Sequence, residues 1–575
     1  MRADFIARVR LIAGVLVLVA LALIGRLYGL QIMEGEAFVK RSEGQHIEKS
    51  AREFDRGRIF FTPKVGPLIA AATVDAGFTL AIIPDEVEDP GAAYRALSVF
   101  VAISEDDFLA KAAKKGDPYE EAAHRVSDEA AKAIRAADVP GARLYREYWR
   151  TYPGAGSAAH LIGFVGYGGG DTLSGQYGLE RFYEDALVKP AGDPYGNFFA
   201  DIFSGIKGQL FTEGMRSGAD VVTAVEPSVQ AFIEDLIARY AREWHPREVG
   251  AIVLDPKTVA VIAMAALPAF DPNDFSQADP DSFINPLVER VYEFGSIMKP
   301  ITMAAGIDSG AITPETTYRD LGYAEYDGAR IENFDGKARG VVPMQEVLSQ
   351  SLNTGIAFIV EKTDTAKVRD YFDAFGIRDA SGIDLPNEAQ PLADNLDSPR
   401  TIEYVTAGFG QGIALSPIGM ARSLATLANG GMVPSPHVAT ELRYPGGISK
   451  KLAWAPAERA VSEESAETVT RMLVSVVDTS LRGGTVRTPE LSVAAKTGTA
   501  QIARPDRKGY YEDRYLHSFF GYFPAYDPRF LVFLYAVAPE GARYSSETWT
   551  SHFMESVRFL MTYYDIPPDR ATTEP

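Results

Sequence analysis

The sequence predicts a multidomain α+β protein with one N-terminal membrane anchor, and three observations lead to this class. An apolar stretch lies near the N-terminus, in residues 11–33. A turn-rich, charged region follows to about residue 217, and helical and strand-like segments alternate from residue 218 to about 566. The chain has 575 residues, of which 46% are hydrophobic, so it can bury more than one core outside the membrane.

The anchor prediction depends on the length and the flanks of the apolar stretch. Residues 11–25 would form a helix of about 22 Å, too short for a bilayer core of about 30 Å, whereas residues 11–33 would reach about 34 Å. The longer segment includes Arg26, which is tolerated near an interface. Arginines precede the stretch and glutamates follow it. We therefore expect a cytoplasmic tail in residues 1–10 and a single-pass protein of the cell (inner or plasma) membrane, with its remainder extracytoplasmic.

A cleaved signal peptide is the alternative interpretation of the same stretch. Residues 20–22 match a small-residue cleavage pattern. However, the apolar run continues through residues 23–24 and resumes after Arg26, which is unusual beside a cleavage site. The pattern favours an uncleaved anchor.

Residues 34–217 alternate turn-rich pieces with charged, helix-like ones. Residues 55–61 are typical of a turn that enters a strand, and residues 91–137 have apolar positions at the spacing of surface helices. Nothing in this region combines a nucleophile with a base. We therefore expect an elongated, non-catalytic pedestal domain of mixed α/β structure.

A second domain is predicted in residues 218–566. Its residues 251–254 and 259–264 are apolar strands on either side of a turn, which predicts a hairpin. Helical and strand-like segments alternate after this hairpin, so a mixed domain is expected. Residues 567–575 are polar and contain prolines, which predicts a disordered tail.

Composition excludes several classes of function. The formal net charge of −20 argues against nucleic-acid binding, because phosphate neutralisation needs a basic surface. The chain has no cysteine, which excludes disulfides and thiolate metal sites, and its seven histidines show no metal-ligand spacing. We expect neither a metal nor a cofactor.

A serine and a lysine lie three residues apart, at Ser296 and Lys299, directly before an apolar, helix-like segment. Residues with this spacing share a helix face, so the hydroxyl and the amine are expected within hydrogen-bonding reach. A neutral lysine can accept the proton of a serine nucleophile. The same spacing recurs at Ser204 and Lys207, but between glycines and without an apolar helix behind it, which is typical of a loop.

Two further motifs follow along the chain. Ser351 and Asn353 lie in a segment expected to be helical, and they offer a hydroxyl for proton relay and an amide for holding substrate. Residues 496–499 read Lys-Thr-Gly-Thr, and their glycine allows a ligand backbone to approach closely. Taken singly, the first motif is typical of a helix cap and the second of an edge strand with a solvated lysine.

The three motifs occur in the order Ser-x-x-Lys, Ser-x-Asn and Lys-Thr-Gly inside one predicted domain, which is the signature of penicillin-binding proteins and serine β-lactamases. With the anchor and further stretches at residues 56–59, 178–180 and 408–412, the chain resembles the class B penicillin-binding proteins, the monofunctional peptidoglycan D,D-transpeptidases. The resemblance implies a pedestal or dimerisation domain and a β-lactamase-like transpeptidase domain, an antiparallel five-stranded sheet flanked by helices. One departure is Val259, in a turn where the family commonly has glycine.

The resemblance also implies roles in acyl transfer through a serine ester. Ser296 would attack the penultimate D-Ala of a stem pentapeptide, and Lys299 would take its proton. The backbone N–H groups of Ser296 and Thr499 would form the oxyanion hole. The complete predicted site consists of catalytic Ser296, Lys299, Ser351, Asn353 and Lys496, with Thr497, Gly498 and Thr499 binding substrate.

The implied partners are peptidoglycan stem pentapeptides, β-lactams as inhibitors, a glycan polymerase of the FtsW/RodA kind and divisome membrane proteins. The length and the Ser351 motif favour a division (FtsI-like) transpeptidase or carboxypeptidase in septal cell wall synthesis. Three alternatives stay open. They are an elongation-type transpeptidase, a β-lactamase or β-lactam sensor, and a scaffold without catalytic activity.

Overall fold

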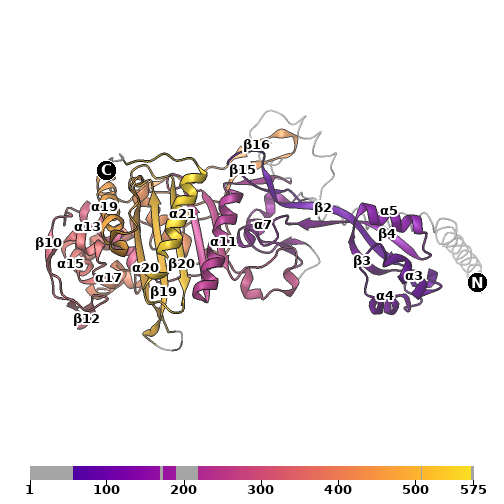
Figure 1. Cartoon of the computed structure of the whole chain (residues 1–575), viewed down its shortest axis with the longest axis horizontal. Coiled ribbons are helices and arrows are strands. Elements are labelled where there is room, and N and C mark those ends of the chain that lie inside the picture. Colours follow the sequence, from indigo (N-terminus) through magenta and orange to yellow (C-terminus); the bar gives the residue numbers. More distant parts are fainter. Residues whose placement is uncertain (1–55, 169–172, 189–217, 505, 507, 571–575) are drawn as a thin grey trace, which may run out of the picture. The chain divides into compact units, whose positions relative to one another are not determined.

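The structure is a computed structural model that describes residues 56–168, 173–188, 218–504, 506 and 508–570 (Figure 1). The described residues form two compact units, one of residues 74–150 and one of residues 56–73 and 151–570. The predicted anchor in residues 11–33 and the second Ser-x-x-Lys sequence lie outside the described residues. Within the described part of the chain, no helix combines the length and the apolar character needed to cross a membrane.

The first unit packs helices against a small sheet. Strands β3 (Glu120–Val126) and β4 (Ala142–Thr151) both pair with β2 (Ile69–Ile82), and β2 and β3 are antiparallel. Its core includes Leu80 and Phe108, both with no exposed surface. The helices are α3 (Pro90–Leu97), α4 (Glu105–Ala112) and α5 (Asp128–Ala137). The prediction that residues 91–137 are helical throughout was therefore wrong at β3, where polar and alanine residues pair with a buried strand.

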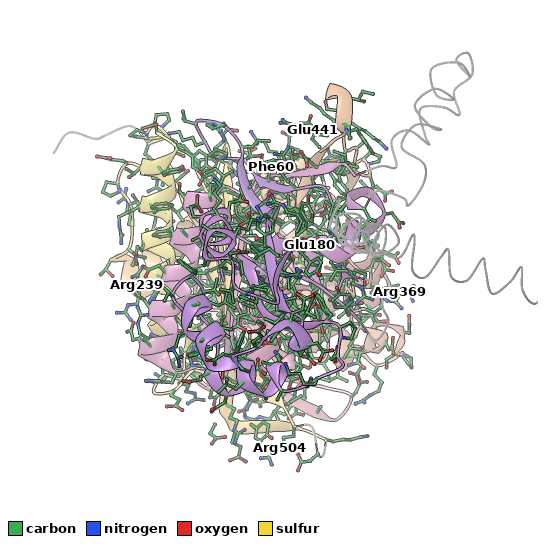
Figure 2. The ribbon with its side chains drawn as sticks, turned by 90° about the vertical axis from the view of Figure 1, so that its right-hand side faces the viewer. Phe60, Glu180, Arg239, Arg369, Glu441 and Arg504 are labelled. Carbon is green, nitrogen blue, oxygen red and sulfur yellow. The ribbon has the colours of Figure 1, made fainter. Side chains whose placement is uncertain are left out.

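The second unit contains a mixed sheet that the sequence did not predict. Its strand order is β16-β15-β7-β1, followed by the first residues of β2. The pair β1–β7 is parallel, and the others are antiparallel. The bounds are β1 (Ile59–Phe61), β7 (Asp220–Thr223), β15 (Ala439–Arg443) and β16 (Ser449–Lys451). Phe60 of β1 and Glu441 of β15, on either side of β7, are labelled in Figure 2. The domain boundary near residue 218 stays a prediction.

The second unit also contains the expected antiparallel five-stranded sheet. Its strand order is β18-β19-β20-β8-β9, and every neighbouring pair is antiparallel. The bounds are β8 (Glu248–Leu254), β9 (Val261–Leu267), β18 (Ala494–Ala503), β19 (Tyr510–Phe523) and β20 (Phe530–Val537). The predicted hairpin is confirmed as β8–β9. Val259 in its turn has φ +54°, the left-handed region that glycine adopts more easily.

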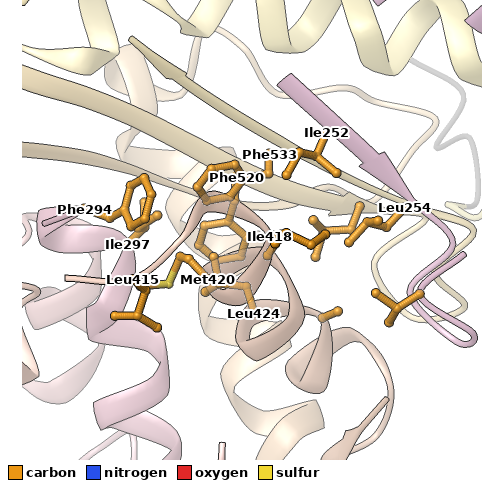
Figure 3. Close-up of a cluster of buried hydrophobic side chains, with 14 of the residues drawn as sticks. Ile252, Leu254, Phe294, Ile297, Leu415, Ile418, Met420, Leu424, Phe520 and Phe533 are labelled. Carbon is orange, nitrogen blue, oxygen red and sulfur yellow. The ribbon is translucent and has the colours of Figure 1, made fainter. Parts of the chain in front are cut away.

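Alternate residues of the five-stranded sheet enter two different cores, as the period of a strand requires. Phe519 and Leu534 pack with α11 (Pro227–Trp244) and α21 (Thr550–Tyr563), which lie together over the sheet in Figure 1. The opposite core is shown in Figure 3, where Phe520, Phe533 and Ile252 meet Ile418 and Leu424 of α18 (Pro417–Ala428). Phe294 and Ile297, on either side of the predicted nucleophile, belong to the second core.

The remaining elements complete the second unit. Its short strands are β5 (Val165–Gly166), β6 (Ser174–Gly175), β10 (Thr317–Asp320), β11 (Tyr323–Tyr326), β12 (Ala329–Glu332), β13 (Gly340–Pro343), β14 (Met432–Val433) and β17 (Glu458–Arg459). Its further helices are α6 (Ala159–Ile162), α7 (Gly178–Phe182), α8 (Glu184–Leu187), α12 (Pro286–Glu289), α13 (Lys299–Asp308), α14 (Met344–Ser349), α15 (Asn353–Thr363), α16 (Thr365–Ala374), α17 (Thr401–Gly408), α19 (Glu463–Ser475) and α20 (Ser545–Thr548). Helices α13, α15 and α17 pack near the five-stranded sheet, on the side away from α11 (Figure 1).

A buried ion pair joins two stretches on which the family resemblance rests. Arg56 Nε donates to Glu180 Oε2 at 2.6 Å, and a second nitrogen of the guanidinium lies 2.8 Å from Glu184. Glu180 lies in the interior, whereas Arg239 and Arg369 are at the surface (Figure 2). Removing one partner of such a buried pair leaves an uncompensated charge, so the pair fixes how these segments pack.

The predicted disorder of the C-terminal tail does not begin at residue 567. Asp569 accepts a hydrogen bond of 2.7 Å from Ser492 N, and Arg570 lies 2.9 Å from Asp478 Oδ2. These polar side chains have specific partners in the domain, which composition alone does not reveal. Residues 571–575 lie outside the described residues.

Candidate active site

The candidate nucleophile lies in the first turn of a helical segment. Ser296 belongs to a 3₁₀-helix, η6 (Gly295–Met298), which continues directly into α13, and Lys299 N donates to Ser296 O. Ile297 and Met298 between them are fully buried. The predicted helical spacing is therefore confirmed, with the two buried side chains fixing the turn against the core.

Close backbone contacts hold this turn against strand β18 and a neighbouring loop. Gly295 has φ +64°, and a Cβ added to it would lie 2.8 Å from Thr499 O. Its N–H donates to Gly410 O at 3.0 Å. A Cβ at Gly498 would lie 2.5 Å from Phe294 O. Only glycine allows this approach at residues 295 and 498.

The amine of Lys299 makes three hydrogen bonds. Its Nζ donates to Ser351 O at 2.6 Å, to Ser351 Oγ at 3.1 Å and to Asn353 Oδ1 at 2.8 Å. Among the described residues, no hydrogen bond joins it to Ser296, so the expected direct bond is absent. Catalytic hydrogen bonds are often loose before substrate binds, and Ser296 lines the same cleft.

Both lysines of the site are buried, and burial shifts their acidity. Lys299 has no exposed surface and Lys496 has 3%. Burial, followed by the nearby charge of Lys496, lowers the pKa of Lys299 well below its ordinary value. Burial lowers the pKa of Lys496 to about 7. Desolvation disfavours the charged amine, so the neutral form of Lys299, which can act as a base, is favoured more than in a solvated lysine.

Ser351 lies in a break between helices, not in the continuous helix that the sequence suggested. Helix α14 ends at Ser349 and α15 begins at Asn353. The φ of Ser351 is +56°, a region that non-glycine residues rarely adopt. In this conformation both its carbonyl oxygen and its hydroxyl accept from Lys299. Strain at such a position is typical of functional sites.

Strand β18 brings the third motif to the same cleft. Lys496 Nζ donates to Ser351 Oγ at 3.2 Å and to Thr497 O at 3.0 Å. Thr497 and Thr499 line the cleft, and Thr499 Oγ1 accepts from Ser545 N at 3.1 Å. Gly498 faces the nucleophile turn, and its contact with substrate stays a prediction.

All five predicted catalytic residues are therefore brought together around one cleft of about 880 Å³. The cleft is large enough for a peptide or drug-sized ligand. It lies between β18 on one side and the α14–α15 break on the other. Its lining includes Ser296, Glu332, Phe334, Ser351, Asn353, Gln411, Leu481, Lys496, Thr497, Thr499, Tyr515, Arg543 and Tyr544.

Asp320, whose buried carboxylate lies behind the Ser-x-Asn motif, was not identified in the sequence analysis. Asp320 is fully buried. It accepts hydrogen bonds of 2.9–3.1 Å from Gly322 N, Asn333 Nδ2, Arg339 N and Thr354 Oγ1. Asn353, next to Thr354, donates from its Nδ2 to Glu332 O at 2.9 Å. The network therefore positions Asn353, and no local motif marks Asp320 or Asn333 in the sequence.

Glu293, which lies three residues before the nucleophile, was assigned no role in the sequence analysis. Its Oε1 accepts from Gly412 N at 3.0 Å and from Tyr510 OH at 3.1 Å. Its Oε2 is buried without a hydrogen-bond partner in the described chain, and burial raises the pKa of the carboxyl. The residue links the nucleophile turn to the β18–β19 hairpin and to the glycine loop at residues 408–412.

Two family models match this chain. The model described as the penicillin-binding protein transpeptidase domain matches residues 249–555, and the penicillin-binding protein dimerisation domain matches residues 56–192. The first match contains every residue of the candidate site. The second includes the whole first unit described above.

Curated relatives and solved structures agree with these matches. The chain is 28% identical to stage V sporulation protein D of Bacillus subtilis, over 88% of this chain and 79% of the relative. It is 26% identical to peptidoglycan D,D-transpeptidase FtsI of Escherichia coli K12, over 99% and 94% of the two chains. Penicillin-binding protein 3 of Mycobacterium tuberculosis complexed with aztreonam superposes with a TM-score of 0.65 at 25% identity, covering 74% of this chain and 92% of that one. Penicillin-binding protein 2X of Streptococcus thermophilus, with a TM-score of 0.71 at 18% identity over 89% and 80%, shows the shared fold.

Proposed function

The chain belongs to the class B penicillin-binding proteins, and from this premise we propose that it crosslinks peptidoglycan stem peptides through an acyl-enzyme on Ser296. The observation that supports this most directly is the position of Lys299. Its buried amine, whose pKa is lowered, bonds both Ser351 and Asn353 one helical turn from Ser296. A neutral amine beside a serine hydroxyl is the arrangement that an activated nucleophile needs.

Acylation begins when Ser296 Oγ attacks the carbonyl carbon of the penultimate D-Ala. The new C–O bond forms as Lys299 Nζ takes the hydroxyl proton. The backbone N–H groups of Ser296 and Thr499 stabilise the oxyanion, where the loss of one donor costs about 3 kcal/mol. The C–N bond to the terminal D-Ala then breaks, and its nitrogen receives a proton through Ser351 Oγ.

Deacylation repeats these steps with an amine as the attacking group. A side-chain amine of a second stem attacks the ester carbonyl and loses a proton to the same base. The C–O bond to Ser296 breaks, the hydroxyl regains its proton, and a crosslink is formed. If water attacks instead, the product is a shortened stem, which is the carboxypeptidase reaction.

Substrate is held at the terminal carboxylate by a positive charge and two hydroxyls. Lys496 provides the charge and Thr497 and Thr499 the hydroxyls, and all three residues line the cleft. Protonated Lys496 also favours the neutral form of Lys299. Both amines bond the hydroxyl of Ser351, and two positive charges so close together repel each other. The same groups would bind the carboxylate of a β-lactam, which would acylate Ser296 as an inhibitor.

The cellular setting follows from the family and from the predicted anchor. We propose a single-pass protein of the cell membrane with an extracytoplasmic catalytic domain, working with an FtsW/RodA-like glycan polymerase and with divisome proteins. A role in division is favoured over elongation by the similarity to FtsI. The similarity to a sporulation protein keeps other cell wall roles open. Depletion separates them, because loss of a division enzyme makes cells filament and loss of an elongation enzyme makes them round.

Labelling of the full-length chain with a fluorescent penicillin tests the chemistry. A stable adduct in the wild type that is absent in Ser296→Ala supports the transpeptidase. Rapid release of the label indicates a β-lactamase, and no adduct in a folded wild type indicates a scaffold. Thermal unfolding of Ser296→Ala serves as the folding control.

A further inference from the structure

The cleft has the opposite charge to the chain as a whole. The protein has a formal net charge of −20. The charged residues that line the cleft are nevertheless basic, with Glu332 as the exception. The basic residues are Arg330, Arg339, Arg482, Lys496 and Arg543. A cleft lined by one sign of charge concentrates ligands of the other sign, so it is built for an anionic ligand.

Two of these arginines already have carboxylate partners. Arg330 lies 2.8 Å from Glu332 Oε1, and Arg339 lies 2.8 Å from Asp335 Oδ1. In the described part of the chain, no acidic side chain pairs with the guanidinium of Arg482 or Arg543. Their charges are therefore available to a ligand.

The backbone of Arg543 is fixed beside the reaction centre. Fully buried His517 contacts Arg543 O through Nε2 at 3.1 Å, and since a carbonyl only accepts, Nε2–H is the donor. The next residues are held too, because Ser545 N donates to Thr499 Oγ1 at 3.1 Å and Ser545 Oγ to Ser518 O at 2.7 Å. The loop is therefore anchored to β18 and β19.

Aromatic rings orient the end of the Arg543 side chain. Its guanidinium carbon lies 5.4 Å from the ring centre of Tyr544, a cation–π distance. Tyr544 in turn meets Phe334, from the opposite wall of the cleft, edge to face at 5.6 Å between ring centres. The guanidinium therefore sits at the Thr499 end of the cleft, next to this aromatic pair.

The order of residues in the donor stem indicates which of them lies near the Arg543 guanidinium. The carbonyl that Ser296 attacks belongs to the fourth stem residue, so the third residue precedes it directly, about 3.3 Å along an extended chain. The terminal carboxylate is bound by Lys496 and by the hydroxyls of Thr497 and Thr499, and the attacked carbonyl lies at the backbone N–H of Thr499. The third residue then extends past Thr499, towards the loop of Arg543.

We propose that Arg543 binds a free carboxylate on the side chain of the third stem residue, so that the preferred donor contains a diaminodicarboxylic acid and not lysine. This inference rests on the proposed transpeptidase function and names its substrate class. A guanidinium fork matches a carboxylate with two parallel hydrogen bonds, which neither an amide nor an ammonium group at that position accepts. Arg543 is thus a specificity-determining residue.

Competition against fluorescent penicillin tests this, because it needs no turnover. The full-length chain in detergent is incubated with pentapeptides whose third residue is meso-diaminopimelate, its side-chain amide or L-lysine. The readout is the peptide concentration that halves the rate of Ser296 acylation. We expect the diaminopimelate peptide to compete about tenfold better than the other two, equal to about 1.4 kcal/mol. Equal competition by all three, or a preference for lysine, overturns the proposal.

Variants of the cleft arginines test which residue is responsible for the difference between the peptides. Arg543→Ala should abolish the tenfold difference while penicillin alone still labels Ser296. Arg330→Ala removes the same charge from the same cleft, but its guanidinium already has a partner, so this matched control should keep the difference. If Arg543→Ala keeps the tenfold difference between the peptides, or if only Arg482→Ala loses this difference, the assignment to Arg543 is wrong.

One further peptide distinguishes the carboxylate of the second stem residue from that of the third. One outcome distinguishes failure of the proposed function from failure of the inference about Arg543. A peptide with an amidated second residue should compete as well as its parent. If it alone competes poorly, the carboxylate bound is that of the second residue, and the proposal fails. If wild type takes no penicillin at all, the proposed function fails, and the inference falls with it.

Discussion

Lys299 Nζ donates a 2.6 Å hydrogen bond to the carbonyl oxygen of Ser351, a residue whose φ is +56°. The left-handed backbone is what turns this carbonyl towards the lysine while the hydroxyl of the same residue bonds both lysines of the site. A buried amine thus has acceptors in either protonation state. The base of the proposed reaction is therefore positioned by the strained backbone of Ser351, the first residue of the Ser-x-Asn motif.

Replacing Ser351 by glycine and by alanine separates the cost of its left-handed backbone from the catalytic role of its hydroxyl. Both variants lose the hydroxyl, so both should acylate far more slowly with penicillin. Glycine adopts φ +56° without penalty, whereas alanine pays about 1–2 kcal/mol in the left-handed region. Thermal unfolding should therefore show Ser351→Gly as the more stable variant. Equal melting temperatures would mean that the left-handed conformation costs nothing here.

The pH dependence of acylation should follow the two lysines. Lys299 must be neutral, so kcat/KM rises with pH through its lowered pKa. Lys496 must be protonated to bind the carboxylate, and its pKa is lowered to about 7, so kcat/KM falls as pH rises through that value. Arginine stays protonated beyond pH 12. Lys496→Arg should therefore move the alkaline limb upward, provided that its melting temperature shows a folded protein. An unchanged limb would assign it to another group.

Asp320 should behave as a positioning residue for Asn353. Four donors converge on its carboxylate, so the NH₂ group of Asp320→Asn would face another donor, at a cost of about 2–3 kcal/mol. The exchange variant Asp320→Asn with Asn333→Asp reverses one donor–acceptor pair and should recover part of the stability and of the acylation rate. Chemical denaturation and penicillin labelling measure the two effects. If the exchange is no better than the single variant, the network does not act as a unit.

Glycine should be needed at residue 295 for the close approach to Thr499 O as well as for the positive φ. Gly310 is a matched control, since it has φ +73° and a Cβ there would meet no atom within 4 Å. Gly310→Ala should cost about 1–2 kcal/mol through φ alone. Gly295→Ala adds a clash with Thr499 O and should cost more, with loss of penicillin acylation. Comparable unfolding free energies for the two variants would show that the turn can move away from β18.

The sequence predicted the site better than the architecture around it. Ser296, Lys299, Ser351, Asn353 and Lys496 carry reactive groups in short local motifs, and the structure brings them to one cleft. Local spacing determines such motifs, so they are visible without coordinates. Their convergence was inferred from the family pattern, because the helical turn at residues 295–298 meets strand β18 only in the folded domain.

The parts that were missed depend on contacts between distant segments. Strand β3 lacks alternating hydrophobicity, and β15 pairs with β7 across more than two hundred residues of chain. Asp320 looks like any surface aspartate until its four donors are in place. Asp569 and Arg570 sit in a polar tail, and only their partners Ser492 and Asp478 show that this part is held.

Detection of the acyl-enzyme tests the proposed reaction on Ser296 most directly. The full-length chain is mixed with a donor pentapeptide, digested and mapped by mass spectrometry, with and without an acceptor stem that bears a free amine. We expect a stem peptide, shortened by one D-Ala, in ester linkage to Ser296, which disappears as a crosslinked dimer forms. An acyl group on any other residue, or crosslinks formed by Ser296→Ala, would contradict it.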